Sequence, residues 1–169
     1  MRTIFGLARR LAHAMHLISG ILLVLMVMTV LLDVLGRFIF GVTSGAVDMT
    51  FPGGVEIVSM CLLFMVLFAL PYSVNRGQVV VDLFTENLPG RVKSLLSGVY
   101  LIGFGLLGCG MAVRFYEAIW SAMESGETSQ DLLIPLYYFY AIAAIATAIL
   151  GLRGLLVALE HIFGMRSPS

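Results

Sequence analysis

LISGILLVLMVMTVLL, the stretch at residues 17–32, is an unbroken run of uncharged and mostly apolar residues. A helix needs roughly 20 such residues to cross the hydrocarbon core of a bilayer, and the surrounding segment Met15–Leu35 is long enough to do so. Three later segments are comparable: Ile57–Tyr72, Leu95–Val113 and Ile134–Leu156. Because backbone polar groups in lipid must find partners within their own segment, the sequence predicts a helix at each of the four.

The predicted fold class is therefore an all-α integral membrane protein with four transmembrane helices. We expect spans at about residues 15–38, 55–74, 94–118 and 134–158, in a single four-helix membrane domain comprising residues 1–169. Arginines precede the first apolar run, as they do in a signal peptide. That run is longer than a signal core and closes with Asp33 and Arg37, so we expect it to be retained as a span.

Composition agrees with a membrane protein and argues against several other classes. Of the 169 residues, 60% are hydrophobic and 12% are charged, whereas soluble domains carry roughly 25% charged residues. The formal net charge is zero, which gives no basic excess for a nucleic-acid partner. Cys61 and Cys109 lie in apolar runs with no second cysteine nearby, and no phosphate loop or nucleophile motif is present. We expect neither an enzyme nor a cofactor, and we interpret the histidines near the ends of the first and last spans as interfacial.

The distribution of Lys and Arg predicts the orientation. Eight of the basic residues lie in the N-terminal tail, the second connection and the C-terminal end: Arg2, Arg9, Arg10, Arg76, Arg91, Lys93, Arg153 and Arg166. The first and third connections carry no Lys or Arg, and the third is acidic. By the positive-inside rule, both termini and the second connection should be cytoplasmic. Within that connection, residues 79–84 fit either a short amphipathic helix in the cytoplasmic interface, which we favour, or an ordinary capped loop.

Small residues indicate which helices approach closely. Ala141, Ala144, Ala148 and Gly151 share one face of the fourth predicted span, and Gly105, Gly108 and Ala112 share a face of the third. Since apolar side chains gain little by leaving lipid for protein, close backbone contact at small residues drives association in membranes. These two faces are expected to meet. The first two spans carry large apolar side chains on all faces, and such surfaces could contact lipid or a protein partner equally well.

Charged residues lie at the ends of the spans. Asp33 and Arg37 are four residues apart and can pair along one helical turn. Glu56 opens the second span, where a carboxylate stabilises the helix dipole, and it could equally reach Arg37 across the two helix ends. We favour the cross-helix bridge. Arg114 and Glu117, three residues apart, should form a similar local pair.

Four short motifs occur in order along the chain. Residues 33–41 read DVLGRFIFG, Glu56 opens the second span, residues 76–82 read RGQVVVD before Leu88-Pro89, and Ser129 precedes LLIP at residues 132–135. Over residues 14–156 this order resembles the small permease subunit (DctQ-like, or Q subunit) of tripartite ATP-independent periplasmic (TRAP) transporters. Gln78 replaces the family's usual His, Tyr137 stands where Trp is common, and the first connection is longer than expected.

The resemblance implies a division of labour between three proteins. A large permease (M) carries the substrate and sodium sites and moves as an elevator, while a periplasmic binding protein (P) delivers a carboxylate. The small subunit would be a static scaffold in the bacterial inner membrane, in contact with the large permease and with membrane lipids. Our candidates for structural or partner contacts are Asp33, Arg37, Glu56, Arg76, Asp82 and Arg114. Candidates for docking the binding protein, or simply for a solvated acidic loop, are Asp48, Glu124, Glu127 and Asp131.

Two other functions remain open at this stage. The chain could be a self-contained small carrier acting as a homodimer, in which case Asp33 would carry the coupling proton. It could also be a membrane enzyme or electron carrier that uses its histidines. The placement of charges at the ends of spans, with none at a midplane, favours the scaffold.

Overall fold

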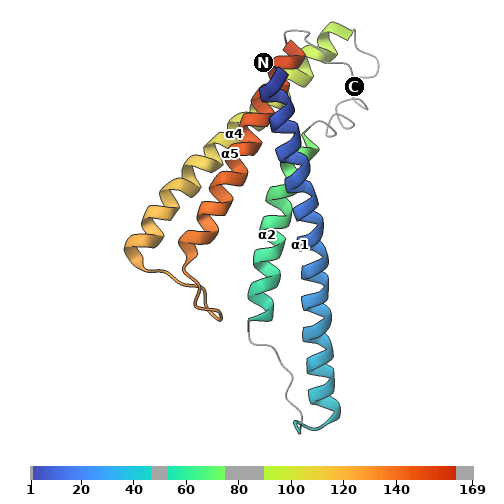
Figure 1. Ribbon diagram of the computed structural model, residues 1–169, viewed down its shortest axis with the longest axis vertical. Helices are drawn as coiled ribbons and strands as arrows, with labels where there is room; N and C mark the ends of the chain where they lie inside the picture. Colours follow the sequence, from blue (N-terminus) through green and yellow to red (C-terminus); the bar gives the residue numbers. More distant parts are fainter. Residues whose placement is uncertain (1, 47–52, 75–89, 163–169) are drawn as a thin grey trace.

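The computed structural model describes residues 2–46, 53–74 and 90–162, which form four long helices (Figure 1). They are α1 (Arg2–Val42), α2 (Gly54–Ser73), α4 (Gly90–Ser125) and α5 (Leu136–Ile162). Each contains a stretch that is long and apolar enough to cross a membrane. In the described part of the chain, β structure is limited to one isolated bridge, so the predicted all-helical class with four candidate spans is confirmed.

Helix α1 is much longer than the predicted span at residues 15–38. Its 41 residues correspond to about 61 Å at 1.5 Å per residue, twice the roughly 30 Å of a hydrocarbon core. The reason is the absence of a helix breaker, since the first proline of the chain is Pro52. The predicted cytoplasmic segment at residues 79–84 lies outside the described residues. The placement of both termini in the cytoplasm and the single-domain assignment stay predictions.

The helices are arranged as two pairs, α1 with α2 and α4 with α5 (Figure 1). The pairs meet through α2 and α5. Met15 of α1, Phe64 and Leu67 of α2, and Ala143 and Ala146 of α5 form one buried cluster. From this junction α4 diverges from α1, so that the two pairs are splayed rather than parallel (Figure 1).

A polar contact joins α5 to α1 at one end of the bundle. Arg153 of α5 is only 4% exposed, and its Nη1 donates a hydrogen bond of 3.2 Å to the backbone carbonyl of Ala8. The first part of α1 and the last part of α5 therefore lie at the same end, which we call the Arg153 end. The opposite end, where α2 begins and α4 is connected to α5, is called the Glu56 end.

Glycines set the contact between α4 and α5. A Cβ added at Gly108 would lie 2.6 Å from the backbone nitrogen of Gly151, and one added at Gly154 would lie 2.8 Å from the Cα of Gly105. The backbones of the two helices are thus in direct contact, as the small-residue pattern predicts. Ala148 of the predicted stripe is exposed, and that part of the prediction is wrong. The buried face of α5 instead contains Thr147, which is completely buried, Gly151 and Gly154. Ala148 lies outside this face.

We predict that Gly151→Ala destabilises the protein while Gly110→Ala does not. The new methyl at position 151 would lie 2.7 Å from the backbone nitrogen of Cys109, so the helices must separate. Overpacking of this kind costs about 1–3 kcal/mol. A Cβ at Gly110 meets no heavy atom within 4 Å, and there the better helix propensity of alanine should leave stability unchanged or raised. Thermal unfolding of both variants in one detergent measures the difference, and equal melting temperatures would contradict the prediction.

Candidate functional site

Glu56 lies in the first turn of α2 and is the acceptor for a cluster of hydrogen bonds. Its Oε2 accepts a bond of 2.9 Å from the backbone N–H of Asp131 and one of 3.0 Å from that of Leu132. Both donors belong to the connection between α4 and α5, 75 and 76 residues away in sequence. The carboxylate therefore fastens this connection to the start of α2.

The connection is folded so that these donors converge. Ser129 is buried, and its backbone N–H donates to the carbonyl of Ile134 (2.9 Å) while its hydroxyl accepts from the Ile134 N–H (3.1 Å). Leu136 N–H donates to the Glu127 carbonyl (3.0 Å), which closes the loop where α5 begins. Leu133 has a left-handed backbone with φ of 54°, an uncommon conformation for a residue with a branched side chain. The loop is thus a defined structure that presents its amides to Glu56.

Gly53, which precedes α2, forms a second contact with the connection between α4 and α5. It has φ of 91° and immediately precedes α2, where a side chain would be strained. A Cβ built there would lie 3.1 Å from Cδ2 of Leu132, so the loop rests against the glycine backbone. The N-terminal end of a helix also carries a partial positive charge, which favours the Glu56 carboxylate in the first turn. Close packing at Gly53, the hydrogen bonds to Glu56 and the helix dipole therefore all stabilise the contact between the loop and the start of α2.

The favoured bridge between Glu56 and Arg37 is wrong. Arg37 Nε instead donates to Asp33 Oδ2 at 2.9 Å, the local pair expected from their spacing along one turn. The physical reason lies on the Glu56 side, because its carboxylate is already occupied by donors of the loop. The Arg37 side chain is 64% exposed, and an exposed pair of this kind contributes little to stability.

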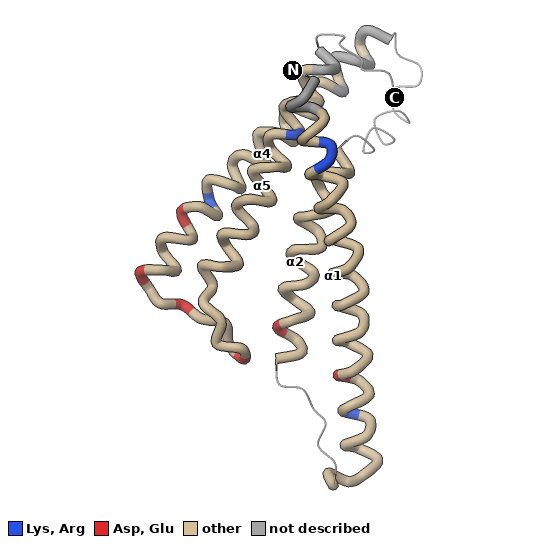
Figure 2. Tube along the Cα trace, viewed as in Figure 1, with Lys and Arg blue, Asp and Glu red and all other residues tan. Residues whose placement is uncertain are grey.

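Arg114 and Glu117 form the second local pair, also at 2.9 Å, and both side chains are largely exposed. Three of the docking candidates, Glu124, Glu127 and Asp131, are exposed at the Glu56 end, where Figure 2 shows the acidic residues of α4 and the following connection. The backbones of Glu127 and Asp131 form the hydrogen bonds described above, but among the described residues no hydrogen bond or ion pair is made by the carboxylates of the three. The remaining candidates, Asp48, Arg76 and Asp82, lie outside the described residues.

The histidines of α1 are close to an aromatic ring of α2. The ring centroid of His16 is 4.5 Å from that of Tyr72 in a stacked arrangement, and that of His13 is 5.7 Å away. In the described part of the chain, no three His, Cys, Asp or Glu side chains are grouped so that they could hold a metal ion. The geometry at this position is that of a contact between α1 and α2.

Comparison with known families adds the decisive observation. Residues 26–164 match the family described as tripartite ATP-independent periplasmic transporters, DctQ component. The chain belongs to this DctQ family. Searches of curated proteins and of solved structures gave no match. The match covers residues 26–42 of α1 and the whole of α2, α4 and α5, so the membership applies to the membrane helices themselves.

Membership in the DctQ family makes this chain the small membrane component of a TRAP transporter. The structure also gives a physical reason for two motifs noted in the sequence. Glu56 and the stretch from Ser129 to Pro135 are far apart in the chain, yet they form one hydrogen-bonded unit. The DVLGRFIFG motif contributes the local pair between Asp33 and Arg37.

Arg153 is the residue that sequence reasoning missed. It was counted only as a basic residue near the end of a span, whereas it is buried and bonded to α1. A signal was present in its neighbours, because Gly151 and Gly154 flank it. Small residues on either side allow a second helix to approach closely, and such an approach buries a long side chain between them.

We predict that Glu56→Ala releases the connection between α4 and α5. Without the carboxylate, the amides of Asp131 and Leu132 lose their acceptor and should exchange hydrogen with solvent at least about tenfold faster. Glu56→Gln keeps one carbonyl oxygen and should show a smaller effect. Hydrogen exchange of the peptide covering residues 127–135 is the measurement. Glu117→Gln removes an exposed carboxylate of α4 and serves as the control, and an exchange rate equal to that of this control would refute the role of Glu56.

Proposed function

We propose that this DctQ-family subunit is a static scaffold for the large permease of its transporter, in sodium-coupled uptake of carboxylates. The observation that carries the proposal is the uneven burial of its helices. Half of the most apolar window of α5 is buried inside the protein, but only 6% of the corresponding α1 window is. The α4–α5 pair forms a close-packed unit, and α1 offers a long surface that the described helices leave exposed.

The placement of charge supports a scaffold rather than a carrier. In α1 no ionisable residue lies between His16 and Asp33, and in α4 none except Tyr100 and Cys109 lies between Lys93 and Arg114. Carriers hold their substrate and coupling-ion sites near the midplane, usually at broken helices or buried charges. Substrate and sodium sites are accordingly assigned to the large permease. The proposed location is the bacterial inner membrane, with both termini in the cytoplasm.

The hydrogen-bonded Glu56 end supports the static role. An element against which a second subunit slides has to keep its own shape. Here the loop that joins α4 to α5 is fastened to α2 by hydrogen bonds, and α5 is fastened to α1 through Arg153 at the other end. The pairs are thereby linked at both ends.

The second candidate, a small homodimeric carrier, depends on Asp33. This residue is partly buried and paired with Arg37. The rings of His16 and Tyr72 stack, and Asp33 follows His16 by 17 residues while Glu56 precedes Tyr72 by 16, so Asp33 lies at the level of the start of α2 rather than of its middle. A carboxylate already neutralised by an arginine, and placed at the edge of the hydrocarbon, is a poor proton carrier. The scaffold reading is therefore preferred.

We expect purification of the tagged chain from native membranes in mild detergent to yield a large polytopic protein at a one-to-one ratio. Mass spectrometry of the complex identifies that partner, and vesicles with the complex should take up solute only when a sodium gradient and the binding protein are supplied. Vesicles that contain this chain alone should take up no solute. Uptake by the isolated chain that is abolished by Asp33→Asn would establish the carrier instead.

The acidic residues at the Glu56 end are proposed to meet the periplasmic binding protein. Charge-neutralising variants at Glu124 and Glu127 should weaken its productive docking about two- to fivefold, with a smaller effect at high salt, because exposed charges act mainly on association. The concentration of binding protein giving half-maximal uptake in reconstituted vesicles measures this. Glu117→Gln is the matched control, and an unchanged half-maximal concentration in the double variant would show that these residues form only a solvated loop.

A further inference from the structure

Leu133, in the connection between α4 and α5, combines an exposed apolar side chain with an unfavourable backbone conformation. Its side chain is 70% exposed, the largest value among the large apolar side chains of the described residues. Its φ of 54° lies in the left-handed region, which the described non-glycine residues adopt only at Ser44 and here. Glycine or asparagine would adopt this conformation at a lower cost than leucine does. The leucine side chain is therefore kept at this position against the preference of the backbone.

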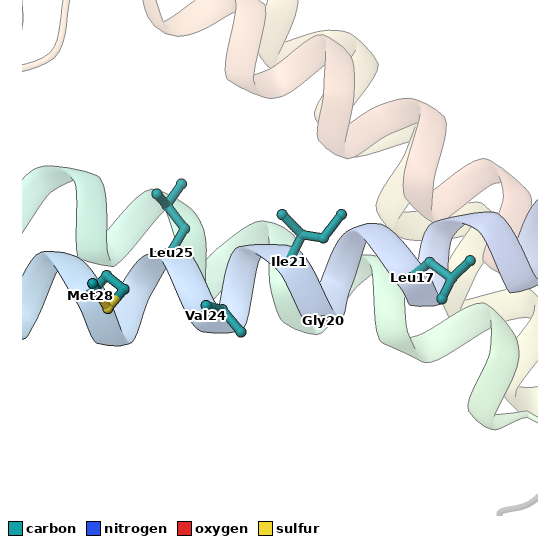
Figure 3. Close-up of a pocket in the computed structure, with 6 residues that line it drawn as sticks. All are labelled: Leu17, Gly20, Ile21, Val24, Leu25 and Met28. Atoms are coloured by element: carbon teal, nitrogen blue, oxygen red, sulfur yellow. The ribbon is translucent and has the colours of Figure 1, made fainter.

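The exposure of Leu133 differs in its meaning from that of the apolar residues of the helices. Exposed apolar side chains on α1 include Leu17, Ile21, Val24, Leu25 and Met28 (Figure 3). They belong to a candidate membrane span, where an apolar side chain that faces lipid loses nothing. Leu133 precedes α5 and lies outside the candidate spans. Its exposure is therefore not explained by the contact of a transmembrane helix with lipid.

The neighbours of Leu133 hold its backbone in place. On one side, the Leu132 N–H donates to Glu56 Oε2 at 3.0 Å, and Leu132 itself is partly buried. On the other side, the N–H and the carbonyl of Ile134 are both bonded to Ser129. Two consecutive leucines thus differ in role, since Leu132 is tied to the start of α2 and Leu133 stays exposed. A side chain on a fixed backbone loses little further conformational freedom when a partner covers it.

The charge around Leu133 favours a protein partner over the membrane surface. Glu127 and Asp131 of the same connection are exposed, and no Lys or Arg occurs between Arg114 and Arg153. Segments that lie in the membrane interface are rich in Lys and Arg, which anionic headgroups attract, so an acidic loop is a poor membrane anchor. An apolar centre with a polar, charged rim is instead the usual anatomy of a protein interface. The loop therefore fits a protein whose facing surface is basic around an apolar recess.

We propose that Leu133 is the apolar anchor of the surface on which the periplasmic binding protein docks. Its side chain enters an apolar recess of that protein, and the carboxylates of Glu124, Glu127 and Asp131 face basic residues around the recess. This role rests on the docking proposed above for the acidic residues and adds the side chain that excludes water at the centre of the contact. The charges then act mainly on the rate of association, and the leucine acts on the lifetime of the complex.

Leu133→Asn tests the anchor, because asparagine removes the apolar side chain and tolerates a left-handed backbone. With the complete complex in vesicles, we expect the concentration of binding protein that gives half-maximal uptake to rise about fivefold or more. The rise should persist at high salt, whereas the effect of neutralising Glu124 and Glu127 should shrink, since salt screens charges but not apolar contacts. Leu133→Met keeps an apolar side chain of similar size and is the matched control, which should retain the wild-type concentration.

The melting temperature of the same variants separates a role in binding from a role in folding. An anchor kept at a cost to the backbone predicts that Leu133→Asn melts at the wild-type temperature or a few degrees higher while docking weakens. A lower melting temperature, or an unchanged half-maximal concentration, overturns the proposal.

A photo-crosslinker at position 133 identifies what covers the side chain in the working complex. Capture of the binding protein is the expected result, and capture of the large permease or of lipid instead overturns the proposal. Uptake by the wild-type complex that needs no binding protein is a different result, because it overturns the proposed function itself.

Discussion

The hydrogen bonds accepted by Glu56 are the constraint on which the arrangement of this end of the molecule depends. The connection between α4 and α5 has backbone amides that no helix or sheet satisfies, and amides that are withdrawn from water need an acceptor. One carboxylate supplies it for Asp131 and Leu132 together. Since a charged acceptor forms stronger bonds than a neutral one, a single side chain is enough to hold the loop against α2.

The two helical pairs are held together by different means. Within the α4–α5 pair the backbones are in direct contact at Gly108 and Gly151. Between the pairs the contact is a cluster of side chains such as Phe64 of α2 and Ala143 of α5, with a hydrogen-bonded link at each end. Side-chain clusters in lipid gain little from hydrophobic burial, because lipid is as apolar as the cluster. The links through Glu56 and Arg153 are therefore what define the geometry of one pair relative to the other.

The helices were predictable from the sequence, but the contact that organises the site was not. Apolar length determines a membrane helix locally, and glycine spacing indicates where α4 and α5 approach. The partner of Glu56, in contrast, is a pair of backbone amides whose position depends on the left-handed turn at Leu133. Every residue except proline has a backbone amide, so the sequence does not indicate which amides will be donors. It does show the charged side chain of Arg37, and the sequence therefore suggested an ion pair between Glu56 and Arg37 instead. The ordered motifs did identify Glu56 and Ser129 as residues of interest, without indicating that they meet.

An exposed α1 has a different meaning here than in a soluble protein. Large apolar side chains in water would favour aggregation, but in hydrocarbon they lose nothing by facing lipid. The segment of α1 from His13 to Asp33 rises about 30 Å without a charged residue between its ends, the thickness of the hydrocarbon core. The apolar surface of α1 therefore provides no selectivity between lipid and protein. Any selectivity has to come from close backbone approach and from the polar ends of the helix, where Arg9 and Arg10 lie at one end and the pair of Asp33 and Arg37 at the other.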